Sequence, residues 1–183
     1  MLHLACLILT QTVYNRKKMM EVRLTHEIDL RQAMRRWPSG VAVVTSGDKN
    51  ISHGMTVNSF VSISIEPPTV SVTMANNTRT KKLVEEFGLF AVNLLAEDQE
   101  HISEVFAGKV GEEGDRFEGL EITTGKTGVP LLMCANAWLE CRVIHRYELP
   151  NSTLYIGEVV SALVNRQEMP LVYFNRGYWR IEK

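Results

Sequence analysis

Residues 54–72 read GMTVNSFVSISIEPPTVSV, and their pattern indicates a β-rich fold. Val61–Ile65 (VSISI) and Thr69–Met74 (TVSVTM) each alternate apolar residues with hydroxyl residues, and Pro67 and Pro68 separate the two runs. Successive side chains of a β-strand point to opposite faces, so this alternation predicts two strands. Each strand then has one face of Val, Ile and Met and one face of Ser and Thr.

The segments on either side extend this β-rich pattern. Val41–Thr45 (VAVVT) is continuously apolar, which predicts a strand buried on both faces. Strands often follow one another directly, without the regular alternation with helices that a doubly wound parallel sheet requires. We therefore expect a mainly β fold, an antiparallel barrel with peripheral helices. The predicted strands cover residues 41–45, 51–60, 61–65, 69–74, 89–95, 135–147, 153–164 and 171–181, and the predicted helices 28–37, 78–87 and 98–107.

The composition narrows the class of protein. The chain has 183 residues, 45% of them apolar and 22% charged, which suits one globular domain with a buried core. Its net charge of −1 gives no reason to expect nucleic acid or a membrane as a partner. The three cysteines, Cys6, Cys134 and Cys141, form no CxxC pair. Such sparse cysteines fit a reducing compartment, so we expect a cytoplasmic protein in which Cys134 and Cys141 are buried thiols.

Residues 1–20 are expected to be an extension that precedes the folded domain, which covers residues 21–183. Leu2–Thr10 (LHLACLILT) is apolar but too short to span a bilayer. The basic residues at 16–18 follow this run, whereas in a secretory signal they precede it. Methionines at 19–20 offer a second initiator, so we expect the extension to be dispensable. A short anchoring helix is the alternative.

The usual catalytic motifs are missing from the sequence. It contains neither GxGxxG nor GxxxxGK[ST], which would signal dinucleotide or P-loop binding. It also lacks HExxH, GxSxG and clustered His and Cys ligands, which argues against a zinc site and nucleophilic hydrolysis. We therefore single out no catalytic residue and no metal ligand, and expect a bound cofactor to supply the chemistry.

Gly54–Phe60 (GMTVNSF) is the first candidate binding segment. Its Thr, Asn and Ser side chains and its backbone N–H groups are neutral donors suited to a planar, polar ligand. A flavin has such a shape, and fixed dipoles near its pyrimidine edge stabilise the negative charge that builds on reduction. The alternative is a polar loop packed by Met55 and Phe60.

Asn76–Lys82 (NNTRTKK) is the second candidate segment. It follows a strand and opens a helix, where we expect Thr78 to act as the cap. Backbone N–H groups at a helix start, hydroxyls and Arg79 or Lys81 together suit a phosphate monoester. A solvated surface helix is an equally good interpretation. In the long loop after the next helix, residues 114–117 (GDRF) form either a ligand-facing or partner-facing loop or a simple turn.

Taken in order, eight motifs resemble the flavin reductase-like family with an FMN-binding split barrel. This family includes reductase components of two-component flavin monooxygenases, ferric reductases and flavoredoxins. The motifs are WPSGVAVVTS (37–46), GMTVNSFVSISIEPPTVSV (54–72), NNTRT (76–80), FAVNLL (90–95), GDRF (114–117), AWLECRV (137–143), LYIGEVV (154–160) and PLVYFNRGYWRI (170–181).

The resemblance implies a six-stranded antiparallel Greek-key split barrel and a homodimer with two flavins near its interface. The cofactor would be FMN or FAD, with NADH or NADPH as co-substrate and a flavin-dependent monooxygenase as a further partner. The resemblance places four residues of one strand beside the flavin: Val43, Val44, Thr45 and Ser46. It places four others around the flavin ring and ribityl chain: Thr56, Val57, Asn58 and Ser59. The residues that it places around the phosphate are Asn76, Thr78, Arg79 and Thr80. Tyr178 and Trp179 would lie near the nicotinamide or flavin, or else serve only in strand packing.

One departure from the family concerns the nicotinamide. Many NADH-using members have Gly-Asp-His before the strand that here begins TLYIGEV, and the sequence has Pro150-Asn151-Ser152 instead. Ser152 cannot supply an imidazole. We expect hydride transfer from NAD(P)H to the flavin, which the protein supports by positioning both. The alternatives are a flavoredoxin-like electron-transfer protein that NAD(P)H does not reduce directly, and a non-catalytic flavin-binding module.

Overall fold

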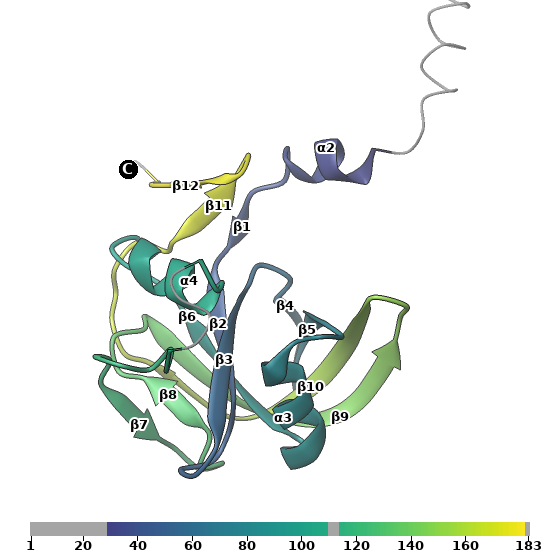
Figure 1. Ribbon diagram of the computed structural model, residues 1–183, viewed down its shortest axis with the longest axis vertical. Helices are drawn as coiled ribbons and strands as arrows, with labels where there is room; N and C mark the ends of the chain where they lie inside the picture. The colour runs from purple at the N-terminus through teal and green to yellow at the C-terminus, as the bar shows by residue number, and fades with distance from the viewer. Residues whose placement is uncertain (1–28, 110–113, 182–183) are drawn as a thin grey trace, which may run out of the picture. The chain divides into compact units, whose positions relative to one another are not determined.

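The computed structural model describes residues 29–109 and 114–181 (Figure 1). The chain divides into two compact units, Met1–Trp37 and Pro38–Lys183. The extension predicted for residues 1–20 lies outside the described residues, so its dispensability stays a prediction.

The described part of the first unit contains the short helix α2 (Leu30–Met34). Its N-cap is Asp29, whose Oδ1 accepts a hydrogen bond from the backbone N–H of Gln32 at 3.1 Å. This side chain satisfies one of the N–H groups that a helix start leaves without a partner. The predicted helix start is therefore confirmed.

The second unit is built on one large antiparallel sheet. Its strands are β2 (Ala42–Gly47), β3 (Ser52–Val57), β4 (Val61–Ile65), β5 (Pro68–Ala75), β6 (Leu89–Leu94), β9 (Ala137–Glu148) and β10 (Ser152–Val164). They lie in the order β3-β2-β6-β9-β10-β5-β4. A three-stranded sheet contains β1 (Ser39–Gly40), β11 (Val172–Phe174) and β12 (Gly177–Trp179). A two-stranded sheet contains β7 (Ile122–Thr124) and β8 (Pro130–Leu132). The helices of this unit are α3 (Arg79–Phe87) and α4 (Glu100–Phe106).

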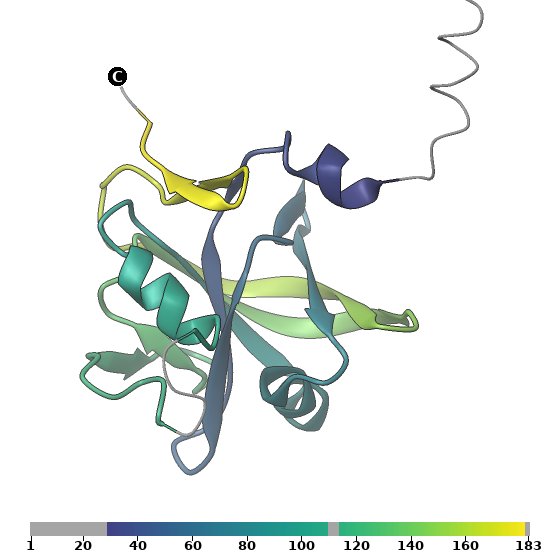
Figure 2. The same ribbon diagram turned by 45° about the horizontal axis from the view of Figure 1, so that its top comes forward.

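The large sheet curves until its two ends approach one another (Figure 2). Just after β3, the Ser59 hydroxyl donates to the Thr73 carbonyl of β5 at 2.8 Å and accepts from the Thr73 N–H at 3.2 Å. Six strands, from β3 round to β5, thus form an incompletely closed barrel, and β4 adds a further strand beside β5. The predicted mainly β split barrel is confirmed.

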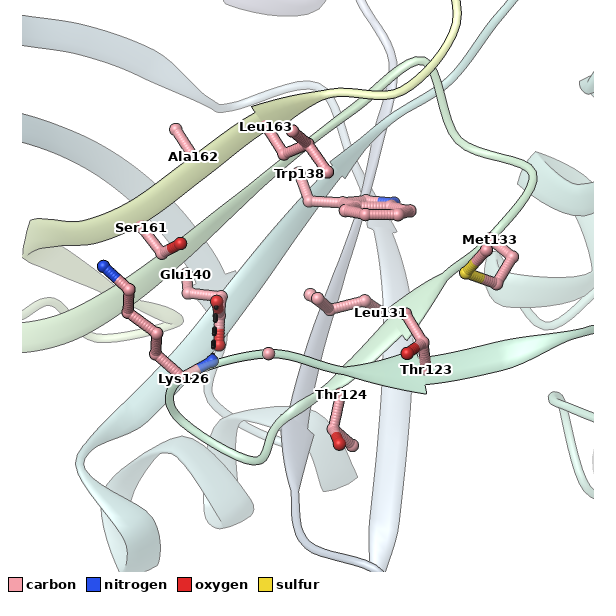
Figure 3. Close-up of a pocket in the computed structure, with 11 residues that line it drawn as sticks. Thr123, Thr124, Lys126, Leu131, Met133, Trp138, Glu140, Ser161, Ala162 and Leu163 are labelled. Atoms are coloured by element: carbon pink, nitrogen blue, oxygen red, sulfur yellow. Dashed lines mark hydrogen bonds between the residues drawn. The ribbon is translucent and has the colours of Figure 1, made fainter.

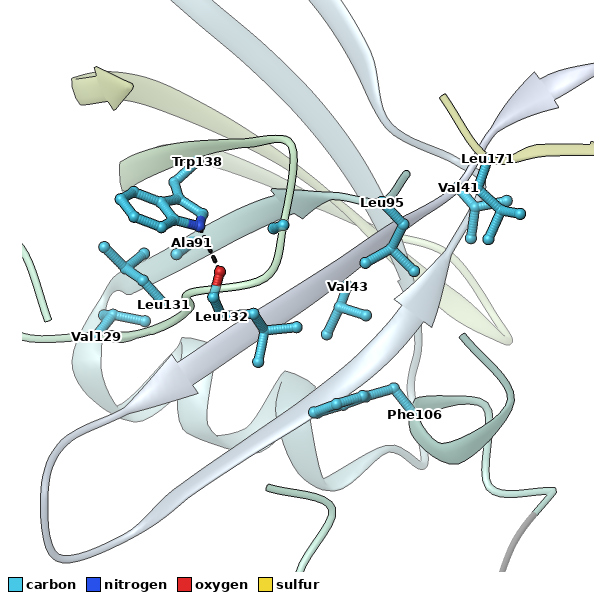
Figure 4. Close-up of a cluster of buried hydrophobic side chains, with 11 residues drawn as sticks. Val41, Val43, Ala91, Leu95, Phe106, Val129, Leu131, Leu132, Trp138 and Leu171 are labelled. Carbon is cyan, nitrogen blue, oxygen red and sulfur yellow. Dashed lines mark hydrogen bonds between the residues drawn. The ribbon is translucent and has the colours of Figure 1, made fainter. Parts of the chain in front are cut away.

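β2 is buried on both faces, as its sequence predicts, and separates two apolar clusters. Val43 points into the first cluster with Phe106 of α4 and Trp138 of β9, whose indole N–H donates to the Leu132 carbonyl (Figure 4). Val44 points into the second cluster, which includes Val84 of α3. The two helices therefore pack on opposite faces of the β2–β3 hairpin.

β5 alternates as predicted, whereas a register irregularity between Ser62 and Ser64 interrupts the alternation of β4. In β5, Val70, Val72 and Met74 are buried, while Ser71 and Thr73 between them are half-exposed. In β4 the apolar side chains of Val61, Ile63 and Ile65 are 56%, 52% and 85% exposed. The edge strand thus carries an apolar surface that this chain does not cover.

Candidate functional site

β3 is an edge strand, so one row of its backbone groups faces no neighbouring strand. In an antiparallel pair, consecutive residues direct their N–H and C=O groups alternately toward the neighbouring strand and away from it. The Gly54 carbonyl points away from β2, because it accepts from the Arg116 guanidinium at 3.0 Å. Ser52 and Thr56 therefore direct their backbone groups to the same free edge. This row of alternating donors and acceptors suits the polar edge of a planar ligand.

A pocket of about 170 Å³, called here the Asn58 pocket, lies at the end of β3. Thr56 donates its hydroxyl proton to the Ser103 carbonyl of α4 at 2.6 Å, and the Ser103 and Tyr178 hydroxyls share a hydrogen bond of 2.9 Å. The Lys109 ammonium lies 5.7 Å from the centre of the Tyr178 ring. The lining is Val41, Thr56, Val57, Asn58, Ser103, Ala107, Lys109, Tyr173 and Tyr178.

Four of the predicted site residues thus meet in the Asn58 pocket: Thr56, Val57, Asn58 and Tyr178. The Asn58 side chain is exposed and makes no hydrogen bond with another described residue, so its amide can bind a ligand. Ser59, next in the sequence, uses its hydroxyl to join the two ends of the barrel.

A second pocket, called here the Arg79 pocket, lies at the start of β3 and has a volume of about 400 Å³. His53 of β3 shares a hydrogen bond of 2.8 Å between its Nδ1 and the Thr80 hydroxyl of α3. Burial, and then the charges of Arg116 and Arg79, lower the pKa of His53 to about 4, so its imidazole is neutral at pH 7. The lining is Lys49, Asn50, Ile51, Ser52, His53, Arg79, Gly114, Asp115, Arg116 and Phe117.

The start of α3 has no side-chain cap among the described residues. Thr78 occupies the N-cap position, but the predicted cap is wrong, because its hydroxyl donates to the Ala75 carbonyl at 2.9 Å instead. The first-turn N–H groups therefore have no side-chain cap, and they lie at the positive end of the helix dipole. Arg79 forms no ion pair with any residue in 29–109 or 114–181.

Asn76, predicted to contact a phosphate, has a structural role in this chain. Its amide nitrogen donates to the carbonyls of Leu149 at 2.9 Å and Pro150 at 3.3 Å, and its oxygen accepts from the Thr153 hydroxyl at 2.8 Å. These bonds hold the β9–β10 turn against the segment that leads into α3. The stretch that departs from the family, Pro150–Ser152, therefore lies beside the predicted phosphate site.

The predicted contacts on β2 lie inside the barrel. Val43, Val44, Thr45 and Ser46 have no exposed surface. The Thr45 hydroxyl donates to the Pro130 carbonyl and the Ser46 hydroxyl to the Leu89 carbonyl at 2.7 Å. Within one chain these residues belong to the strand that pairs with β3. A direct contact with a flavin stays a prediction.

Trp179 does not line either pocket in the described residues. Its side chain is exposed, and its indole N–H donates to the Phe174 carbonyl at 3.0 Å. Of the predicted aromatic pair, only Tyr178 thus belongs to the candidate site.

The two predicted binding segments line two pockets rather than one shared cleft. β3 joins the pockets, and its five steps from His53 to Asn58 span about 16 Å. Sequence reasoning missed His53 and the α4 side of the Asn58 pocket. It did select residues 114–117, where Arg116 holds β3 and α4 together through the carbonyls of Gly54 and Phe106.

A larger pocket of about 580 Å³ contains none of the predicted site residues (Figure 3). It lies between the β7–β8 hairpin, the start of β9 and the end of β10, with the Trp138 ring on one side. The buried Glu140 carboxylate accepts from the N–H groups of Lys126 and Thr127 and from the Thr127 hydroxyl. Its hydrogen bonds thus hold a loop in place.

The two described thiols are protonated at neutral pH. Burial raises the pKa of Cys141 to about 12 and also raises the pKa of the half-buried Cys134. A protonated thiol is a poor nucleophile, so neither cysteine is a catalytic candidate. Across the described residues, no group of three His, Cys, Asp or Glu is placed to hold a metal ion. The helices that the structure describes include none long and apolar enough to cross a membrane.

Comparison with known proteins defines the class of protein. The family model described as "Flavin reductase like domain" matches residues 34–182. The chain therefore belongs to the flavin reductase-like family.

Individual relatives agree with this assignment. The reductase component of FADH(2)-dependent resorcinol hydroxylase from Rhizobium sp. is 39% identical over 82% of this chain and 84% of the relative. An NADH-dependent flavin reductase from Rhodococcus sp. is 34% identical over 85% and 86%. The solved styrene monooxygenase flavin reductase from Pseudomonas putida S12 superposes with a TM-score of 0.75, at 33% identity over 85% of this chain and 98% of that one.

Proposed function

We propose that this chain is an NAD(P)H-dependent flavin reductase that passes electrons from the reduced flavin to a monooxygenase. The observation that carries the proposal is the free edge of β3, whose two ends lie at the Asn58 pocket and at the uncapped start of α3. Relatives named as flavin reductases and as monooxygenase reductase components support both halves of the proposal.

The residues present fit a flavin mononucleotide. Thr56 presents backbone groups at the strand edge and Asn58 a free amide, which suit the N–H and C=O groups of the flavin ring. Arg79 and the N–H groups at the start of α3 suit its phosphate. FMN is the flavin that this set accounts for, and FAD contains the same portion.

The proposed contribution of the chain is binding and orientation. The bound flavin supplies the hydride acceptor, and the nicotinamide supplies the hydride. Asn58 and the β3 edge hold the ring in one orientation, while Tyr178 is kept in place by its hydrogen bond to Ser103. Fixed dipoles near the ring also stabilise negative charge that develops on it. This proposed role calls for no acid or base from the described residues.

A homodimer is part of the proposal. The Asn58 pocket of about 170 Å³ is smaller than a typical small-molecule site of roughly 300–1,000 Å³, so one chain does not enclose a flavin ring. We propose that a second copy covers the exposed apolar side chains of β4 and completes the pocket. We also propose the cytoplasm as the location, which suits two free thiols.

The proposal is tested by mixing the purified protein with NADH or NADPH and with FMN, FAD or riboflavin, and following nicotinamide absorbance. We expect oxidation that requires both the flavin and the protein. No oxidation with either nicotinamide would disprove the reductase activity.

A second candidate function is that of an electron-transfer flavoprotein reduced by another protein. The Pro150–Ser152 turn favours it, because no imidazole is available there for a nicotinamide. A protein that keeps bound FMN through gel filtration, and whose flavin is reduced by dithionite but not by NAD(P)H, would support this alternative.

A further inference from the structure

We propose that the pocket shown in Figure 3, called here the Trp138 pocket, binds a neutral aromatic molecule that carries a hydroxyl group. It shares no lining residue with the Asn58 pocket or the Arg79 pocket, so this site is separate from the one proposed for the flavin. Its volume of about 580 Å³ lies within the roughly 300–1,000 Å³ that small-molecule sites span. One chain therefore provides room for a small organic molecule.

Two cross-strand pairs of the β9–β10 hairpin form one wall of the Trp138 pocket. Trp138 lies opposite Leu163, and Glu140 lies opposite Ser161. Alternate residues of a strand share one face of the sheet, so both pairs direct their side chains to the same side. The first pair is apolar and the second is polar, which gives this wall an apolar part and a polar part.

The β7–β8 hairpin supplies another wall. Leu131 of β8 is paired with Thr123 of β7, and Leu131 lies beside the Trp138 ring in both close-up views (Figures 3 and 4). The Trp138 indole N–H donates to the Leu132 carbonyl at 2.6 Å, which fixes the orientation of the ring. An aromatic ligand bound against Trp138 and Leu131 therefore gains from the burial of apolar surface and from ring contact with the indole.

The two charged side chains in the lining have opposite signs, which favours a neutral ligand. Burial alone would raise the pKa of Glu140, but hydrogen bonds from Thr127 and Lys126 lower it, so its carboxylate is charged at pH 7. Lys126 carries the opposite charge and forms no ion pair with a described residue. Because the two charges balance, neither an anion nor a cation gains enough from them to offset its loss of hydration.

Thr123 supplies the hydrogen-bond partner for a ligand hydroxyl. It lines the pocket, and its side-chain hydroxyl forms no hydrogen bond with a described residue. The Glu140 carboxylate, in contrast, already accepts from the N–H groups of Lys126 and Thr127 and from the Thr127 hydroxyl. A ligand hydroxyl can both donate to Thr123 and accept from it, since each group has one proton and free lone pairs.

The test measures the binding of naphthol through its own fluorescence, independently of turnover. Naphthalene is the analogue without a hydroxyl, and naphthoate is the charged analogue. The proteins are wild type, Thr123→Val, Leu163→Ala and the control Val164→Ala, which alters the next residue of β10, exposed and outside the pocket lining. We expect wild type to bind naphthol more tightly than either analogue.

Thr123→Val keeps the shape of the side chain and removes its hydroxyl, so it should weaken naphthol binding by about fivefold and leave naphthalene binding unchanged. Leu163→Ala removes part of the apolar wall and should weaken both ligands by about threefold. The Val164→Ala control should bind both ligands like wild type.

No binding of naphthol to wild type, or binding that neither Thr123→Val nor Leu163→Ala weakens, would overturn the site. Displacement of naphthol by saturating FMN would also overturn it, because the ligand would then occupy the flavin site. Naphthoate that bound as tightly as naphthol would overturn the assignment to a neutral ligand.

Discussion

Arg79 and His53 illustrate how single residues act at the start of β3. Arg79 is exposed and has no ion-pair partner in the described part of the chain, so it can bind a ligand without breaking an existing contact. His53 is half-buried and instead joins β3 to α3 through Thr80. Arg79 was selected from the sequence because it is a cation at the start of a predicted helix. His53 was not selected, because its role depends on Thr80, which is distant in the sequence and close only in the folded chain.

Replacing Arg79 with Ala should weaken FMN binding by about tenfold, since a charge-assisted hydrogen bond to the phosphate is lost. Riboflavin, which lacks the phosphate, should bind as it does to wild type. Isothermal titration with both ligands measures the difference, and Lys82→Ala, an exposed cation further along the same helix, is the control. Equal losses for FMN and riboflavin would contradict a phosphate contact.

His53 should make the fold sensitive to acid. Its pKa of about 4 in the folded chain lies below the ordinary value of 6.5, so the unfolded chain binds a proton more readily between these pH values. The contribution of His53 to the free energy of unfolding is therefore complete above about pH 6.5 and is lost as the pH falls toward 4. Thermal unfolding of wild type and His53→Gln should show a smaller acid loss in the variant. Parallel losses in the two proteins would rule this role out.

At the scale of elements, β3 is held between two helices that pack on opposite faces of the sheet. α4 contacts it through Thr56, and α3 through His53. Arg116 adds a third contact by bonding the Gly54 carbonyl. Because the strand has a neighbour on only one edge, these contacts determine how it presents its free backbone groups.

Gly54 allows α4 to pack closely on β3. A Cβ at this position would lie 2.6 Å from a ring carbon of Phe106 and 3.2 Å from Thr45 Cγ2. Gly54→Ala should therefore lower the free energy of unfolding by about 1–3 kcal/mol, measured by urea denaturation. The control is Gly40→Ala, where an added Cβ meets nothing within 4 Å. Similar stability of both variants would show that the α4 contact tolerates the extra carbon.

At the scale of the whole molecule, the exposed apolar side chains of β4 are the surface proposed for a second copy. Val61, Ile63 and Ile65 alternate along an edge strand and remain exposed in the single chain. Burial of such side chains contributes about 1.5–3 kcal/mol each, so a second copy would gain from covering them.

Ile65→Glu should convert a dimer to a monomer, because it places a charge in the proposed apolar interface. Size-exclusion chromatography with light scattering measures the mass, and fluorescence titration measures the accompanying loss of flavin affinity. Ser62→Glu, on the same strand, is the control and should leave the dimer intact. A monomeric wild type, or a dimeric Ile65→Glu, would contradict an interface at β4.

Local sequence pattern was sufficient for the β-rich fold, the buried strand β2 and the helix that begins at Arg79. Each depends on residues close together in the chain, such as the alternation of Val70–Met74 or a cation at a helix start. Tertiary structure alone showed that the hydroxyls of Thr45 and Ser46 are satisfied inside the barrel and that Thr78 does not cap α3. The reason is that a polar side chain takes whichever partner the packing of distant segments brings to it, and no local pattern encodes that partner.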